Sequence, residues 1–98
     1  MGLRHVVTLT FADDTTDGQV EEIVEALRLL PSQIDELRSY VVGTDAGISE
    51  GNASLAIVAD FDSVDDYEVY RDHPAHQAVI TQLIVPVIVG RSAVQHHT

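Results

Sequence analysis

Residues 53–61 are the segment that most restricts what this chain of 98 residues can fold into. Successive side chains of a β-strand point to opposite faces, and here both sets are apolar. One face carries Leu55, Ile57, Ala59 and Phe61, and the other carries Ala56 and Val58. A strand that is apolar on both faces needs cover on both faces. Helices of the same chain can supply one layer, whereas so short a chain has little left for the other. The segment therefore predicts a partner subunit.

The two segments at the start of the chain predict a strand followed by a capped helix. Residues 4–11 alternate, and one strongly apolar face is formed by His5, Val7, Leu9 and Phe11. Thr16 and Gln19 then fit a capping box, in which the threonine oxygen accepts from the amide three residues later. We expect the helix to end at Pro31, because the residue before a proline avoids helical geometry.

The remaining segments complete an alternating order of strands and helices. A second strand is expected at residues 37–43 and a final edge strand at residues 91–96. Ser63 fits a helix cap, and the helix that follows carries three residues inward: Val64, Tyr67 and Tyr70. Pro74 then opens a further helix, since the first helical position loses nothing by lacking an N–H. The order β-α-β-β-α-β is the ferredoxin-like α+β plan, in a single domain over residues 1–98.

Charge and composition argue against several functional classes. The chain has 16 acidic residues, only five arginines and no lysine, and its net charge is −11. Nucleic-acid binding relies on clustered basic residues, so we expect no nucleic-acid partner. Without cysteine, thiol catalysis and cysteine-ligated zinc are excluded.

Apolar runs in the chain are too short for a membrane role. The longest run, residues 83–89, contains a proline and falls far short of the roughly 20 residues that a membrane span requires. Residues 1–5 lack the long apolar core of a secretion signal. We therefore expect a cytoplasmic protein with no membrane partner.

The densest group of titratable side chains lies in residues 70–77. We expect Arg71 and Asp72 to form a surface ion pair or a subunit contact. His73 should cap a helix or lie in a loop, because a proline follows it. His73 and His76 are three residues apart, as a metal pair on a helix can be, but a third ligand at defined spacing is missing. We expect neither a metal nor a cofactor.

Two alternatives stand for each of the histidines near an apolar face. His76 can act as a general base on a proton next to a carbonyl, with Tyr70 either as its hydrogen-bond partner or as the donor to the developing enolate oxygen. Alternatively, it bonds a backbone carbonyl or Tyr70 and only fixes the start of a helix. His5 is either a satisfied core group, as most buried polar groups are, or a second contact to a ligand.

Three motifs occur together in the chain: His5-Val6-Val7, Phe61-x-Ser63-Val64 and His73-Pro74-Ala75-His76. In this combination they resemble the stress-responsive A/B barrel family, also called the dimeric α/β barrel domain, over essentially the whole chain. The resemblance implies a ferredoxin-like protomer that pairs its sheet with a second copy, so that a barrel closes across a homodimer. It also implies a small pocket between the sheet and the helices of each protomer.

The family includes plant polyketide cyclases, which close a linear polyketide by intramolecular aldol condensation. The resemblance implies His76 as the base, Tyr70 as its supporting tyrosine and His5 as the first-strand histidine of the pocket. Leu55 and Leu27 stand where those enzymes carry a histidine and a tyrosine.

These replacements favour an apolar pocket in which a small apolar or polyketide-like molecule contacts Leu27, Leu55 and Ile57. We therefore expect a homodimer with a small apolar ligand pocket. A polyketide-cyclase-like enzyme is the alternative, and a non-catalytic stress or accessory protein is the competing class.

Overall fold

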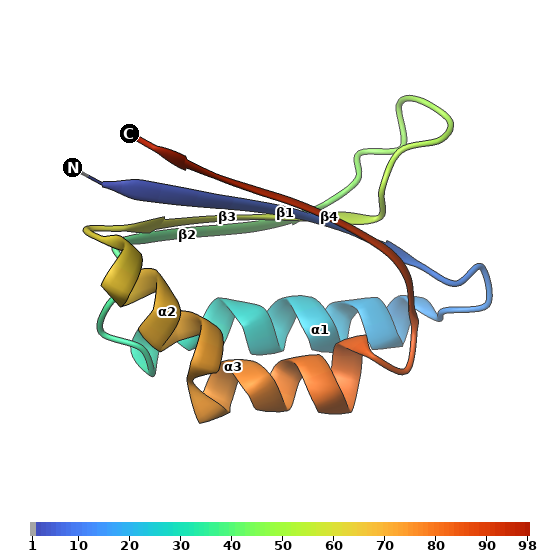
Figure 1. Cartoon of the computed structure of the whole chain (residues 1–98). Helices are drawn as coiled ribbons and strands as arrows, with labels where there is room; N and C mark the ends of the chain where they lie inside the picture. The colour runs from blue at the N-terminus through green and yellow to red at the C-terminus, as the bar shows by residue number, and fades with distance from the viewer. Residues whose placement is uncertain (1) are drawn as a thin grey trace.

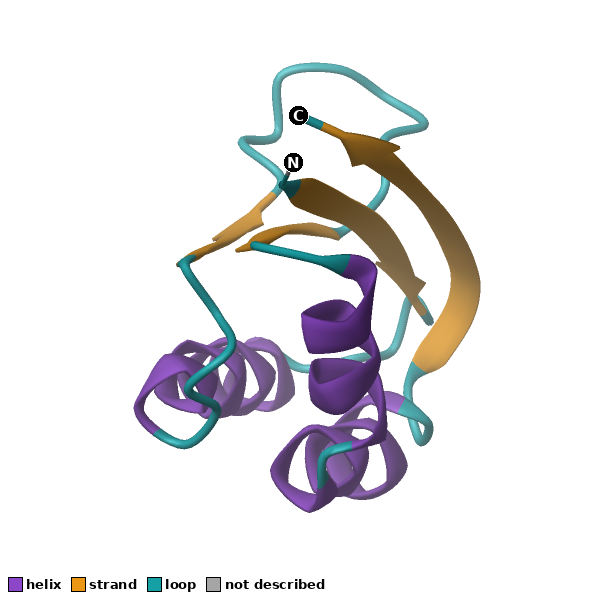
Figure 2. Ribbon diagram, turned by 60° about the vertical axis from the view of Figure 1, so that its left-hand side comes forward, coloured by secondary structure: helices purple, strands orange, loops and turns teal. Residues whose placement is uncertain are grey.

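One four-stranded antiparallel sheet carries all the described helices on a single face (Figures 1 and 2). The computed structural model describes residues 2–98. The elements, in chain order, are β1 (Leu3–Phe11), α1 (Asp17–Leu29), β2 (Ser39–Thr44), β3 (Leu55–Phe61), α2 (Val64–Asp72), α3 (Pro74–Val79) and β4 (Ile88–His97). The strands lie side by side in the order β2-β3-β1-β4. The predicted ferredoxin-like α+β fold is confirmed, with its second helical segment divided in two.

The first helix begins where the capping box predicts. The amide of Gln19 donates to Thr16 Oγ1 (3.2 Å), and the amide of Thr16 donates to Gln19 Oε1 (2.8 Å). The end differs slightly from the prediction, because α1 stops at Leu29 and the chain continues as a 3-10 turn over Leu30–Ser32. Pro31 fits this turn because an N–H is not needed at its first positions.

The break between α2 and α3 is fixed by His73 and Pro74. His73 has an extended backbone (φ −62°, ψ 134°), the conformation that a following proline favours. Its Nδ1 accepts from the amide of Ala75 (3.1 Å), so its predicted role as a helix cap is confirmed. A π-helical turn, Ile80–Ile84, extends α3 towards β4.

One inward position predicted for α2 is wrong. Tyr70 is buried and Tyr67 is half-buried, as expected, but Val64 is 44% exposed. Val64 is the first residue of α2, where the described part of the chain leaves it largely uncovered.

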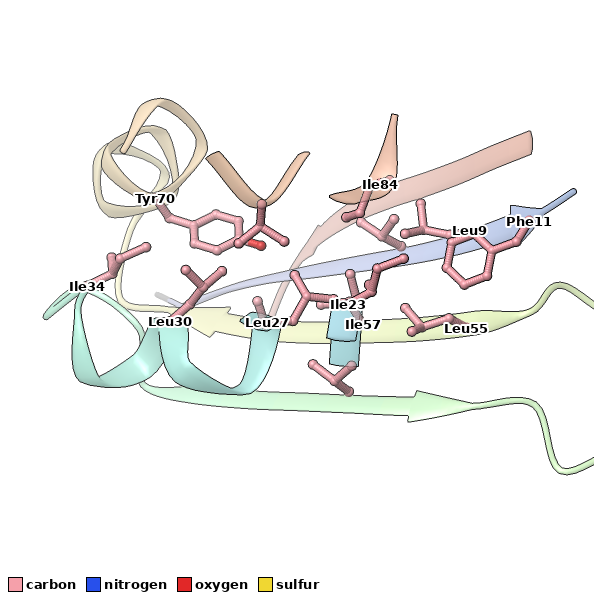
Figure 3. Packing of buried hydrophobic residues seen from close by; sticks show 14 of the residues in the cluster. Leu9, Phe11, Ile23, Leu27, Leu30, Ile34, Leu55, Ile57, Tyr70 and Ile84 are labelled. Carbon is pink, nitrogen blue, oxygen red and sulfur yellow. The ribbon is translucent and has the colours of Figure 1, made fainter. Parts of the chain in front are cut away.

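The core fills the space between the sheet and the helices, as Figure 3 shows. The strand residues predicted for this face of β3 are all buried, namely Leu55, Ile57, Ala59 and Phe61. On the helical side, α1 and the 3-10 turn contribute Ile23, Leu27 and Leu30, whereas α2 and the π-helical turn contribute Tyr70 and Ile84. None of the helices in residues 2–98 is both long enough and apolar enough to cross a membrane.

The other face of the sheet is open and carries a continuous row of valines. The pairing registers align Val41 with Val58, Val58 with Val6, and Val6 with Val94, so the row crosses all four strands. Val41 and Val94 are 60% and 55% exposed. We call Val6, Val41, Val58 and Val94 the valine row.

We predict that replacing His73 with alanine lowers the free energy of unfolding by about 1 kcal/mol, the typical loss for a helix cap. The reason is that the amide of Ala75 loses its side-chain acceptor. Urea unfolding followed by circular dichroism measures the change. His73→Asn supplies another capping acceptor and is the matched control, which should retain most of the stability. Equal stability of the alanine variant and the wild type would show that the cap contributes nothing.

Candidate functional site

A cavity of about 240 Å³ lies between the helix-facing side of the sheet and the segment formed by α2, α3 and the π-helical turn. Apolar side chains from β1, α1, β3, the π-helical turn and β4 form most of its wall. The polar or titratable groups that line it are His5, Tyr67, Tyr70, Arg71, His76, Gln77 and Arg91. The structure therefore brings together side chains from both ends of the chain.

Most of the residues predicted for the site line this cavity. His5, Tyr70 and His76 do so, together with Leu27 and Ile57.

Leu55 does not line the cavity. The β1–β3 register pairs Leu55 with Leu9, whereas His5 pairs with Ala59. Leu55 therefore lies four residues along β3 from the level of His5, in the core beside Leu9 and Phe11 (Figure 3).

His76 is held by a backbone carbonyl. Its Nδ1 lies 3.0 Å from the carbonyl oxygen of Arg71. A carbonyl oxygen can only accept a hydrogen bond, so the Nδ1 atom carries the proton and Nε2 keeps a lone pair. Gln77 Nε2 donates to the same carbonyl (2.6 Å), which fixes the start of α3 around the histidine.

Tyr70 contacts His76 through its ring and not through its hydroxyl. The ring centroids are 4.1 Å apart, with 31° between the planes. The predicted Tyr70–His76 hydrogen bond is therefore wrong, because the Tyr70 hydroxyl pairs with the hydroxyl of Tyr40 (3.0 Å). Tyr70 is only 2% exposed, and a buried hydroxyl needs such a partner.

His5 is both a satisfied core group and part of the cavity wall. It is 4% exposed, its ring centroid lies 4.9 Å from that of Tyr67, and Gln95 Nε2 donates to its Nδ1 (2.7 Å). With Nδ1 accepting, the proton of the neutral imidazole lies on Nε2. The partners of His5 and His76 thus select opposite tautomers.

Burial keeps both histidines neutral. It lowers the pKa of His5 to about 4, with a smaller contribution from the positive charge of Arg91 and a further one from the nearby His76 imidazole. Burial also lowers the pKa of His76, although the hydrogen bond to the Arg71 carbonyl opposes this shift. The hydroxyl of Tyr70 stays protonated, since burial raises its pKa to about 12. The two imidazoles that line the cavity therefore favour the neutral form, one with a lone pair and the other with a proton on Nε2.

Six polar residues at or behind this site were not predicted as site residues: Tyr40, Tyr67, Arg71, Gln77, Arg91 and Gln95. Arg91 and Gln95 occupy alternate positions of β4 that face the same side as His5, because Gln95 pairs with His5 and Arg91 with Leu9. Strand alternation indicates which side of β4 they share, but only the register assigns them to the cavity. Tyr40 lies two residues before the buried Val42 on β2, so the two side chains point to the same, helix-facing side.

Metal ligands do not gather at this site. In the described part of the chain, no three His, Cys, Asp or Glu side chains are placed to hold a metal ion. His73 uses its Nδ1 to cap α3, whereas His76 faces the cavity.

Comparisons with known proteins agree with this architecture. A stress-response A/B barrel domain-containing protein of Arabidopsis thaliana is 30% identical, over 95% of this chain and 93% of that protein. Olivetolic acid cyclase of Cannabis sativa is also 30% identical, over 78% of this chain and 77% of the enzyme. A dimeric ferredoxin-like protein of Thermobifida fusca superimposes with a TM-score of 0.92 at 41% identity, covering 100% of this chain and 92% of that one.

The sequence profile of the stress responsive A/B barrel domain matches residues 3–96, nearly the whole chain. The chain belongs to the stress responsive A/B barrel domain family.

Proposed function

We propose that the cavity binds a small, mostly apolar carbonyl compound, that His76 removes a proton from it and that His5 donates a hydrogen bond to its oxygen. The observation that carries this proposal is the pair of Nδ1 contacts, to the Arg71 carbonyl in His76 and to the Gln95 amide in His5. These partners favour a lone pair on Nε2 of His76 and a proton on Nε2 of His5. A base and a hydrogen-bond donor at one cavity are the two groups that enolisation requires.

The proposed step is removal of a proton next to the carbonyl group. The lone pair on His76 Nε2 accepts this proton, and the electrons of the broken C–H bond form a C=C bond as negative charge collects on the carbonyl oxygen. His5 donates a hydrogen bond from Nε2 to that oxygen and stabilises the charge. The ring of Tyr70, 4.1 Å from that of His76, restricts the base to one orientation.

The size and lining of the cavity indicate the scale of the ligand. Its volume of about 240 Å³ exceeds that of an apolar cavity of roughly 150 Å³ that accepts benzene. One ring with short substituents, or an aliphatic chain of similar volume, fits this space. Leu27 and Ile57 offer such a ligand apolar contacts.

Intramolecular aldol condensation is a second, more specific candidate. It begins with the same proton removal, after which the enolate carbon attacks a second carbonyl of the same molecule. The 30% identity to olivetolic acid cyclase favours it, since the name of that enzyme describes a ring closure.

We further propose that two copies of the chain pack their open sheet faces together. The valine row places four branched apolar side chains on a face that the helices leave bare. Contiguous apolar surface of this kind marks interaction sites in soluble proteins. The Thermobifida fusca protein is described as dimeric, which supports the same assembly here.

We predict that the protein accelerates exchange of the α-protons of small 1,3-diketones with deuterated water, and that His76→Ala lowers this rate about 100-fold or more. The expected loss follows from removal of the base. NMR spectroscopy of the diketone signals measures the rates. His96→Ala, which removes an exposed histidine outside the cavity, is the matched control and should exchange at the wild-type rate.

The same experiment separates catalysis from binding. If wild-type protein binds the diketones but exchange stays at the background rate, the cavity holds a ligand without moving its protons, and the accessory-protein alternative is correct. If His76→Ala fails to fold, as judged by circular dichroism, the histidine serves mainly to fix the start of α3.

We predict a stable dimer of the wild-type protein at micromolar concentration and a monomer for Val58→Glu. The substitution would bury a carboxylate without a partner in the middle of the valine row. Sedimentation velocity distinguishes the two states. Val69→Glu introduces the same charge at a 45% exposed position of α2 and should remain dimeric. A monomeric wild type would contradict the proposed interface.

We predict that acid destabilises the protein partly through His5. Its folded-state pKa of about 4 lies below its ordinary value of 6.5, so the unfolded chain binds the proton first. Stability contributed by neutral His5 is present above pH 6.5 and is lost as pH falls towards 4, by about 3 kcal/mol in total. Urea unfolding at pH 7 and at pH 4 measures the fall in the free energy of unfolding between the two pH values. This fall should be smaller in His5→Gln than in the wild type. Equal losses in both proteins would mean that His5 is charged in the fold.

A further inference from the structure

We propose that the cavity selects apolar ligands that carry a carboxylate, and that Arg91 at its mouth binds this group. The inference rests on the proposed function, because it assumes that the cavity takes a small ligand. It adds the charge of that ligand and the residue that recognises it.

The charge of the cavity wall is opposite to that of the chain. The chain carries 16 acidic side chains and a net charge of −11. In the described structure, however, no aspartate or glutamate lines the cavity, whereas two arginines, Arg71 and Arg91, do. A wall with this composition raises the local concentration of anions in an otherwise anionic protein.

Arg91 is the arginine whose charge is left available. Three others form ion pairs: Arg4 with Asp60 (2.8 Å), Arg38 with Asp62 (2.8 Å) and Arg71 with Asp72 (2.9 Å). Arg28 donates to the carbonyl oxygen of Val42 (2.8 Å). Among the contacts of residues 2–98, the guanidinium of Arg91 has neither a carboxylate nor a hydrogen-bond partner. Its positive charge also contributes to the lowered pKa of both His5 and His76, so its field reaches the cavity.

The position of Arg91 suits an anion at the mouth and an apolar body further in. Arg91 is exposed on β4, and its pairing with Leu9 places it on the helix-facing side of the sheet. Deeper in the cavity, Leu27 and Ile57 are 1% and 5% exposed, and an anion beside them would lose its hydration without compensation. A carboxylate on Arg91 keeps contact with water while the rest of the ligand is buried. The planar guanidinium matches a carboxylate with two parallel hydrogen bonds.

Benzoate and benzamide test the proposal, because they have nearly the same shape and differ in charge. NMR chemical-shift titration measures the dissociation constant of each, even in the millimolar range. We expect wild-type protein to bind benzoate about tenfold more tightly than benzamide, the preference that one charge-assisted hydrogen bond typically gives. In Arg91→Gln the preference should disappear, while the affinity for benzamide stays the same.

Two control variants separate the role of Arg91 from general charge effects. Arg38→Gln makes the same change in net charge away from the cavity and should retain the preference for benzoate. Arg91→Lys keeps the positive charge but loses the planar guanidinium, and it should retain only part of the preference for benzoate. An equal loss in Arg38→Gln and Arg91→Gln would overturn the assignment of Arg91.

The outcomes also distinguish this inference from the proposed function. Equal affinity of the wild type for benzoate and benzamide would overturn the carboxylate site and leave the apolar cavity intact as a ligand site. Absence of binding by both compounds would contradict the proposed function itself, and the inference with it. If Arg91→Gln loses the preference for benzoate and Arg38→Gln keeps it, the result supports both the carboxylate site and the proposed function.

Discussion

The register between β1 and β4 is the constraint on which the site depends. It pairs His5 with Gln95 and Leu9 with Arg91, so that residues from the two ends of the chain meet on the helix-facing side of the sheet. A slip of one residue would turn Gln95 and Arg91 to the open face and would leave His5 without its hydrogen bond. β1 itself is held by its pairing with β3 on the other side, because a slip of β1 would turn the buried Val7 and Leu9 to the open face.

The fold was largely predictable from the sequence, because the signals that begin and end its helices involve residues close together in the chain. The capping box at Thr16, the Ser63 cap and the break at His73-Pro74 involve residues within three positions of one another. Alternation in residues 53–61 correctly assigned the face that the helices bury, and the cover predicted for the other face stays a prediction. The exact ends of the strands and of α1 were less predictable, since they depend on pairing partners and on the 3-10 turn at Pro31.

The site was only partly predictable, because its contacts join distant parts of the chain. His5, Tyr70 and His76 were expected and do line one cavity. The hydrogen-bond partner of Tyr70 was not expected, because Tyr40 is 30 residues away in the sequence. Tyr40 lies on β2, an edge strand of the sheet, and no motif surrounds it. Likewise, nothing near Gln95 or Arg91 in the sequence indicates that either one faces the cavity. A buried polar group finds its partner in three dimensions, and sequence spacing carries that information only within a helix or a turn.

The alternation of β1 has a consequence for how such a protein can change over time. Odd-numbered positions from Leu3 to Phe11 face the helices and the cavity, and even-numbered positions between them face outward. A substitution on one side of the strand therefore leaves the chemistry of the other side nearly untouched. Related proteins built on this sheet can therefore change the ligand cavity and keep the outer surface, or change the outer surface and keep the cavity. Neighbouring positions of β1 are enough for either change, because they face opposite sides.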